Sequence, residues 1–426
     1  MLRRAIGLHM VAAMLASATP ATATDPLGGK ALYDDVQRYD SFGPHRYGSA
    51  GAAQAFDWIA DELARAGLTV SSQSFTMDRQ YDFEAGSLSV DGQTVAVMPH
   101  WWIPEALASF SLRAPIAAAG DASGRFVRVT LPFDRAAYLS QAHHAALDEA
   151  FARRPAAVLL TIDHPSAEIY TYNVDQEAKP WPVPVILVAA RDKALLDAAQ
   201  QAGRPVAVDI KGRYRRDVPG RNVIGRLKGG GAGRAIVVST PVTSWFTSTC
   251  ERAPGIAGFL AMARLAGTRL AGAELVFVAT AGHEVGHGGM AHFIRSQAPP
   301  PAATLAWAHF GASLACHEWR RDGERWVAGA AVDTHLRVIA RSQSMDDLVR
   351  RHFGGIAGTG LVGDKAAVGE LRDVHAAGYP NFFGMAGLHG LFHTPADNAA
   401  GTGPDSLEPV ARAFAGALRE VAASAK

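Results

Sequence analysis

The stretch ELVFVATAGHEVGHGGMAH, Glu274–His292, decides how this chain folds. It opens with an apolar run, Leu275–Ala279, and a glycine-rich segment follows that carries His283, Glu284 and His287. Two interpretations compete. The letters H-E-x-x-H match a zinc signature of metalloproteases. The context, a buried strand that ends in a glycine-rich loop with an acidic residue, indicates a different kind of zinc site.

The H-E-x-x-H interpretation requires a helix. Both imidazoles must project from one helical face, four residues apart, so that the glutamate can activate a zinc-bound water. The preceding residues look like a strand, and Gly282, Gly286, Gly288 and Gly289 are poor helix residues. The sequence therefore predicts a loop here and argues against a metalloprotease helix.

Composition leaves most function classes open but excludes some partners. The chain has 426 residues, of which 48% are hydrophobic and 19% charged, with a formal net charge of +1. This length allows two or more domains with sizeable cores. The near-zero net charge gives no indication of a nucleic-acid or anionic-membrane partner. The two cysteines, Cys250 and Cys316, are expected either to pair in an oxidising compartment or to remain as buried thiols.

Residues 1–23 have the pattern of a secretory signal. Two arginines at positions 3 and 4 precede an apolar stretch, Ala5–Ala18, and Ala21-Thr22-Ala23 is a suitable cleavage site. The rest of the sequence contains no run of about 18 apolar residues, which is the length that a membrane-spanning helix needs. We therefore expect a periplasmic or secreted protein, cleaved after Ala23.

The rest of the chain divides into a main domain and an insert. Residues 24–81 and 217–426 show continuous apolar strands that alternate with helices, which predicts an α/β fold with a mostly parallel, mixed sheet covered on both faces. Residues 82–216 have shorter strands and more loops, and indicate a small β-rich inserted domain with a basic, turn-prone exit at Lys211–Arg221. Ligands of such sheets bind beyond the carboxyl ends of the strands.

Several segments, taken in order, resemble the zinc exopeptidase family that includes secreted bacterial leucyl aminopeptidases, glutamate carboxypeptidase and glutaminyl cyclases. The matching segments are HRYGSAGAAQAFDWIADELARAGL at His45–Leu68, RNVIGRLKG at Arg221–Gly229, IVVSTPVTS at Ile236–Ser244, CERAPGIAGFLAMAR at Cys250–Arg264, VFVATAGHEVGHGG at Val276–Gly289, GYP at Gly378–Pro380 and FHTPAD at Phe392–Asp397. The insert resembles the protease-associated domain found in many members. The resemblance covers nearly all of the chain after the signal.

The resemblance implies a two-zinc site of which only part is kept. Pro241-Val242-Thr243-Ser244 replaces the H-x-D-S motif, so the histidine ligand of zinc one is lost. Gly311 stands where an aspartate completes zinc one, with His309 nearby. Glu251 replaces the aspartate that bridges the two zincs. His283-Glu284 replaces the E-E pair, in which the first residue is the base and the second a ligand of zinc two.

The positions around zinc two keep residues that bind metals. By this resemblance Glu251, Glu284 and His393 are the expected ligands of one zinc, and His283 takes the place of the base. Three protein ligands and one water are the usual catalytic zinc arrangement. His287 is a further candidate ligand. Gly369-Glu370-Leu371 matches an S-D-H motif, which makes Glu370 a candidate for acid–base work or for holding a substrate amine.

Three functions are compatible with these residues. The first is a single-zinc exopeptidase-type hydrolase acting on peptides or small amides, with His283 as base. The second is an acyl-transfer or cyclising enzyme like the glutaminyl cyclases, which work with one zinc at this location. The third is a non-catalytic protein that binds peptides or partners in the cleft, favoured by Pro241, Thr243, Gly311 and Leu371.

Overall fold

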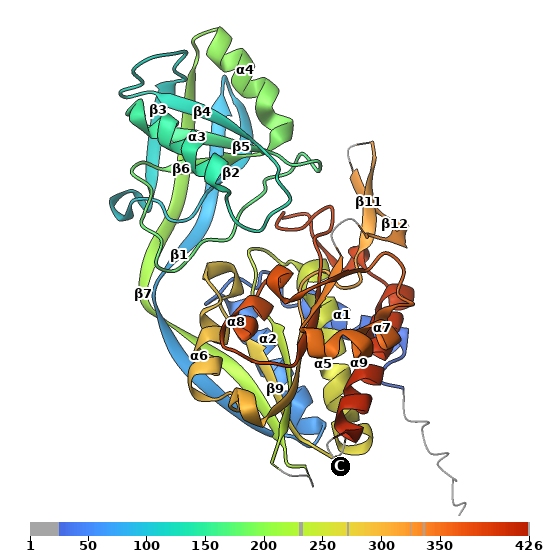
Figure 1. Ribbon diagram of the computed structural model, residues 1–426. Coiled ribbons are helices and arrows are strands. Elements are labelled where there is room, and N and C mark those ends of the chain that lie inside the picture. The colour runs from blue at the N-terminus through green and yellow to red at the C-terminus, as the bar shows by residue number, and fades with distance from the viewer. Residues whose placement is uncertain (1–24, 230–232, 271, 324, 335–336, 425–426) are drawn as a thin grey trace, which may run out of the picture.

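The computed structural model describes residues 25–229, 233–270, 272–323, 325–334 and 337–424. The predicted signal, residues 1–23, lies outside these ranges. None of the described helices is long and apolar enough to cross a membrane. The chain forms two lobes joined by the long strands β1 and β7 (Figure 1).

A mixed sheet forms the centre of the larger lobe and confirms the predicted α/β class. Its strand order is β14-β13-β15-β10-β8-β9-β7-β1. The pairs β14/β13, β15/β10, β10/β8 and β8/β9 are parallel, whereas β13/β15, β9/β7 and β7/β1 are antiparallel. The bounds are β1 Thr69–Val90, β7 Pro205–Leu227, β8 Ala235–Pro241, β9 Glu274–Thr280, β10 Thr304–Phe310, β13 Val338–Arg341, β14 Gly360–Val362 and β15 Phe382–Ala386.

Successive residues of a strand point to opposite faces of the sheet, so both faces of this sheet carry apolar side chains. Helices cover both faces. Ile236 and Phe277 belong to one apolar core, and their neighbours Val237 and Val276 belong to another. The first core includes residues of α1 (Gly29–Asp40), α2 (Ala50–Arg65), α5 (Thr249–Arg269), α7 (Asp346–Phe353) and α9 (Pro404–Ala423). The second includes residues of α6 (Gly288–Ser296) and α8 (Leu371–Ala376).

The smaller lobe is the predicted insert, and it is built on the far halves of β1 and β7 (Figure 1). Its other elements are β2 Gln93–Pro99, β3 Phe110–Pro115, β4 Phe126–Pro132, α3 Gln141–Ala152, β5 Ala157–Asp163, β6 Val185–Val188 and α4 Lys193–Gln201. A hairpin of β11 (His317–Asp322) and β12 (Arg325–Val332) extends separately from the larger lobe.

The predicted domain boundaries at residues 82 and 216 fall inside paired strands, and the predicted exit turn is wrong. Lys211–Arg221 continues β7 without a break, and Asp82 pairs with Arg213 in the ladder with β1. The basic residues lie along a two-stranded ribbon, where they find acidic partners: Arg215 Nε donates to Asp82 Oδ2 at 2.5 Å. The cluster of charges therefore reflects an exposed ribbon and not a loop.

Helix α5 begins at Thr249, so Glu251 and Arg252 lie in its first turn. The N-terminus of α5 follows the end of β8, the edge at which ligands of open α/β sheets bind. The candidate ligand Glu251 is therefore held by a helix.

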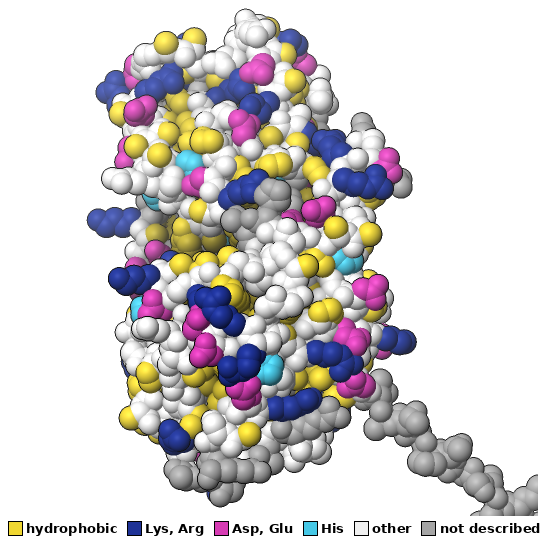
Figure 2. Space-filling view, turned by 45° about the vertical axis from the view of Figure 1, so that its right-hand side comes forward, with side chains coloured by type: hydrophobic (Ala, Val, Ile, Leu, Met, Phe, Trp, Pro, Cys, Tyr) yellow, Lys and Arg dark blue, Asp and Glu magenta, His cyan; other side chains and the backbone are white. Residues whose placement is uncertain are grey.

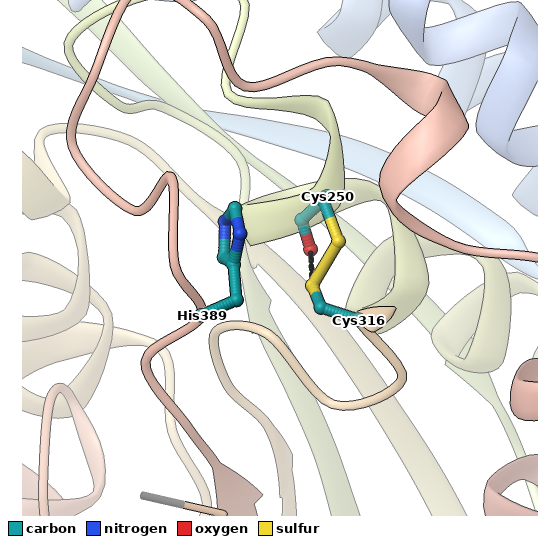
Figure 3. Close-up of side chains that lie close together, drawn as sticks. All are labelled: Cys250, Cys316 and His389. Carbon is teal, nitrogen blue, oxygen red and sulfur yellow. Dashed lines mark hydrogen bonds between the residues drawn. A yellow bond between two sulfur atoms is a disulfide. The ribbon is translucent and has the colours of Figure 1, made fainter. Parts of the chain in front are cut away.

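Cys250 and Cys316 form a disulfide that joins the first turn of α5 to the segment after β10 (Figure 3). Both residues are buried, and the pairing settles the alternatives that the sequence left open. The bridge spans 66 residues and lies directly beside Glu251. It therefore ties down the helix end that carries a candidate site residue.

Replacing both cysteines by alanine should lower the free energy of unfolding by about 2–4 kcal/mol, because the bridge restricts a long loop in the unfolded chain. Urea denaturation of the double variant and the parent measures the loss. Titration of the denatured, unreduced parent should find no free thiol in Cys250 or Cys316. Two free thiols would contradict the pairing.

Candidate functional site

The decisive segment is a tight turn and not an α-helix. Strand β9 ends at Thr280, and a single 3-10 turn, His283–Val285, follows. Gly282, Gly286 and His287 all adopt positive φ angles, of 77°, 92° and 57°. Left-handed backbone on both sides of the turn is incompatible with an H-E-x-x-H helix. The segment instead presents Glu284 inward and the two imidazoles toward a cavity.

Glu284 is fully buried and is held by the scaffold. Its Oε1 accepts a hydrogen bond from the backbone nitrogen of Tyr47 at 2.6 Å, and its Oε2 accepts one from Thr243 Oγ1 at 2.6 Å. The same Thr243 oxygen accepts a hydrogen bond from the backbone nitrogen of Gly282 at 2.8 Å. Burial raises the pKa of Glu284, and the two hydrogen bonds act in the opposite direction. Thr243, which replaces the aspartate of the lost motif, therefore ties this carboxyl group to the loop.

Glu251 is paired with the side chain that follows it in the sequence. Arg252 Nη2 lies 2.7 Å from Glu251 Oε1, and both side chains are fully buried. Ser244 Oγ donates to Glu251 Oε2 at 2.7 Å. Burial alone would raise the pKa of Glu251, but Arg252 and then His393 outweigh it and lower the pKa to about 2. Glu251 is therefore a buried anion with a buried cation in contact.

Arg252 is anchored by one directed hydrogen bond, from Nε to the carbonyl oxygen of Thr243 at 3.0 Å. Its two terminal nitrogens have no directed hydrogen-bond partner, although one is in ion-pair contact with Glu251. The positive charge also acts to lower the pKa of Glu284 and Glu370. One guanidinium thus serves several buried carboxyl groups.

His393 reaches the same carboxylate from the opposite side. Its Nδ1 lies 2.9 Å from the carbonyl oxygen of Thr171, which can only accept, so Nδ1 carries the proton. Its Nε2 lies 3.5 Å from Glu251 Oε1 and has no hydrogen-bond partner. Thr171 belongs to the insert, so the insert fixes the orientation of this imidazole.

The three predicted zinc ligands, Glu251, Glu284 and His393, already have other partners in the protein. Glu251 Oε1 and His393 Nε2 have no directed hydrogen-bond partner, and atoms of this kind are suited to bind a metal. Arg252, however, already supplies a positive charge to the same oxygen, and Glu284 has a donor on each oxygen. Within the described ranges, three potential ligand atoms lie within 4.8 Å of one another only in Cys250, Cys316 and His389, and that group contains the disulfide. Glu251, Glu284 and His393 therefore do not fit a zinc ion as arranged.

A cavity of about 560 Å³ opens beside this cluster. Most of its walls are apolar, and it contains three imidazoles, those of His283, His287 and His309. Arg135 and Arg372 also line it. The rings of His283 and His287 are stacked with their centroids 4.6 Å apart. Among the site residues predicted from the sequence, His283 and His287 line the cavity. Glu251, Glu284 and His393 lie behind its wall.

Glu370 supports His283 from behind. Its carboxyl group lies 3.3 Å from His283 Nδ1 and contacts Thr280 Oγ1 at 2.7 Å. Glu370 is fully buried and does not line the cavity, so it does not reach a substrate amine there. Burial raises its pKa to about 8. Burial also holds the pKa of His283 well below its ordinary value.

Sequence reasoning missed two important residues. Arg252 stands next to Glu251 in a quoted segment, and a charged residue at the start of an otherwise apolar helix was the available signal. His309 was noted only as a neighbour of Gly311, yet it is His309 that lines the cavity, and its Nδ1 lies 2.8 Å from Ser239 Oγ. An imidazole at the carboxyl end of a buried strand was the signal there.

Arg252→Ala should lower the free energy of unfolding by about 3–5 kcal/mol, because it leaves the buried Glu251 anion without its cation. The double variant Arg252→Ala/Glu251→Gln should recover part of the loss, since no buried charge remains unpaired. Urea denaturation measures both. Arg412→Ala, which breaks only exposed ion pairs, is the control and should cost less than about 1 kcal/mol. Equal losses in Arg252→Ala and Arg412→Ala would contradict the burial argument.

Glu370 should make stability depend on pH. Its pKa is raised from 4.5 to about 8, so the folded chain holds a proton that the unfolded chain releases, and stability should fall as pH rises from about 4.5 to 8. Glu370→Gln should flatten this slope and be the more stable protein at pH 8. Denaturation midpoints from pH 5 to 9 test this, with the exposed Glu318→Gln as control. An unchanged slope in Glu370→Gln would refute it.

The comparisons with known proteins place this fold. No protein-family model matches the chain, and no curated protein matches it in sequence. Solved structures do match: a zinc aminopeptidase from Bacillus subtilis, at 16% identity and a TM-score of 0.70, covers 93% of this chain and 95% of its own. A peptidase M28 precursor from Shewanella amazonensis, also at 16% identity, has a TM-score of 0.69 and covers 92% of each chain. The chain therefore has the fold of the zinc aminopeptidases, as its sequence motifs predicted.

Proposed function

We propose that this protein binds peptides or small amides in the cavity beside His283, and that it does not use the two-zinc chemistry of the aminopeptidases it resembles in fold. One observation carries the proposal. The carboxylate expected to bridge the metals, Glu251, is in contact with the guanidinium of Arg252 inside the protein. The guanidinium of Arg252 therefore occupies the place beside Glu251 where the resemblance implies a zinc ion.

Charge explains why this substitution matters. A zinc ion placed among Glu251, Glu284 and His393 would lie close to the buried Arg252, and two cations in a site of low dielectric repel one another strongly. The loss of the H-x-D-S histidine and the change of the base position to His283 point the same way. These two substitutions and Arg252 form a consistent set, in which the family's metal is no longer required for charge balance.

The cavity supports ligand binding. Its volume, about 560 Å³, lies in the range of sites for small molecules, and apolar walls with a few polar groups are typical of such sites. Arg135 and Arg372 offer positive charge to a carboxylate, and the Arg372 guanidinium lies 5.8 Å from the centre of the Tyr138 ring. A short peptide with a free carboxyl end is the ligand class that these groups suit.

A second candidate is the single-zinc hydrolase. It is favoured by Glu251 Oε1 and His393 Nε2, which lie 3.5 Å apart and have no directed hydrogen-bond partner, and by the zinc aminopeptidases of the same fold. The glutaminyl-cyclase-like reaction is a variant of it, and a product lighter by ammonia would identify that reaction. Export to the periplasm or beyond, by the signal at residues 1–23, is part of either proposal.

The test combines binding with activity on the mature chain. Calorimetric titration with a set of di- and tripeptides should show binding, and Arg372→Ala should weaken it at least about tenfold by removing a charge-assisted contact. Arg350→Ala, an exposed arginine outside the cavity, is the matched control and should leave affinity unchanged. Aminoacyl anilides and dipeptide amides should not be hydrolysed after incubation with zinc.

Two results would overturn the proposal. One is hydrolysis that chelation abolishes, zinc restores and Glu251→Gln or Glu284→Gln removes, since that pattern belongs to the single-zinc hydrolase. The other is equal affinity of the parent and Arg372→Ala for every peptide, which would show that the cavity is not the binding site.

A further inference from the structure

The wall of the cavity beside His283 is positively charged. Arg135 from the smaller lobe and Arg372 from α8 both line it, and both residues are exposed. Among the residues that the structure describes, none with an acidic side chain lines the cavity. A ligand in the cavity therefore meets two guanidinium groups and no described carboxylate.

The acidic residues near the cavity face other partners. Asp373 Oδ2 lies 2.8 Å from His287 Nδ1, outside the cavity wall. Glu370 is fully buried, and Asp175 borders a separate pocket. A ligand ammonium group that enters the cavity would lose water without gaining an anionic partner, and burying an unpaired charge is costly. The cavity therefore disfavours ligands that bring a free amine into it.

The two guanidinium groups that line the cavity are available to an anion. Within the described ranges neither Arg135 nor Arg372 takes part in an ion pair, whereas Arg264 contacts two carboxylates. The Arg372 guanidinium lies 5.8 Å from the centre of the Tyr138 ring, which belongs to the same segment of the smaller lobe as Arg135. Each lobe thus brings one guanidinium to the cavity. Charge-assisted contacts of this group with a carboxylate are among the strong hydrogen bonds of proteins.

Most of the remaining wall is apolar and comes from the larger lobe. Its side chains include those of Val338, Val362, Ala367, Val368, Leu388 and Phe392. Such a wall favours the burial of aliphatic groups and offers no partner to a charged side chain. The cavity therefore suits a ligand with an aliphatic body and a carboxylate.

We infer that the cavity binds carboxylates that lack a free amine, namely N-acylated amino acids or short N-acylated peptides with aliphatic side chains. Arg135 and Arg372 hold the carboxylate, and the aliphatic side chains lie against the apolar wall. This inference rests on the proposed function and narrows its ligand class. It also sets the cavity apart from a site for the amino-terminal residue of a peptide, whose ammonium group needs a polar or anionic partner.

The ligand class is tested with three compounds: N-acetyl-leucyl-leucine, leucyl-leucine, and N-acetyl-leucyl-leucine whose carboxyl group is amidated. Calorimetric titration of the mature chain measures their affinities. The acetylated acid should bind at least about tenfold tighter than the other two, because leucyl-leucine adds an unpaired ammonium and the amide lacks the carboxylate. Equal or tighter binding of leucyl-leucine would overturn the inference.

Variants at the two arginines test which groups hold the carboxylate. Arg135→Ala and Arg372→Ala should each weaken binding of the acetylated acid at least about tenfold and leave the affinity for its amide unchanged. Both residues are exposed, and circular dichroism establishes that the variants fold. Arg113→Ala, which changes an exposed arginine of β3 outside the cavity, is the control and should bind like the parent. Equal losses for the acid and the amide would contradict the carboxylate contact.

A variant that adds an acid to the wall tests the charge argument in the opposite direction. Val368 lines the cavity and is 41% exposed, so a larger polar side chain is tolerated there. Val368→Glu should raise the affinity for leucyl-leucine relative to the acetylated acid about two- to fivefold, because the ammonium gains an exposed ion-pair partner. An unchanged ratio of the two affinities would contradict the argument.

The outcomes also separate this inference from the proposed function. If leucyl-leucine binds as tightly as the acetylated acid, and Arg372→Ala weakens both, this inference is overturned while peptide binding in the cavity stands. If none of the three compounds binds, both are overturned.

Discussion

The buried contact between Arg252 and Glu251 constrains the whole centre of this protein. Moving either charge out of water is costly, and the cost is offset only when both are held together with further polar partners. Ser244 supplies one partner to Glu251, and the Thr243 carbonyl supplies one to Arg252. Both partners come from the segment after β8, where the sequence resembles an H-x-D-S zinc motif without its histidine. This segment therefore supports the buried ion pair.

Much of the fold could be predicted because it depends on local patterns. Ser49 caps α2 by accepting from the backbone nitrogen of Ala52, and the apolar run Leu275–Ala279 lies within β9, as its pattern indicated. The continuity of β7 could not be predicted, because its basic middle resembles a turn when the partner strand β1 is unknown. Pairing of segments more than a hundred residues apart, such as Asp82 with Arg213, supplies the ladder bonds that override that local preference.

The site was predicted less well, for a different physical reason. Motif matching identifies positions, and it placed Glu251, Glu284, His283 and His393 in one region of the fold. It does not say which atoms are already paired. Whether a buried carboxylate can take a metal depends on its other partners, and here those are Arg252, Thr243 and the backbone of Tyr47. Two of these three come from segments distant in sequence from the carboxylate that they bind.

The insert contributes to the site in a way that its sequence did not reveal. The carbonyl oxygen of Thr171 fixes the ring of His393. Asn173 lines the cavity, and its Oδ1 accepts a hydrogen bond from the indole nitrogen of Trp245 at 2.9 Å. The backbone nitrogen of Val174 donates to the carbonyl of Glu284. On the face that Figure 2 draws, charges of both signs are interspersed. The insert forms part of the cavity wall through Asn173. Since one segment of the insert touches both the carboxylate cluster and the cavity, a ligand that displaces this segment would alter His393 and Glu284 together.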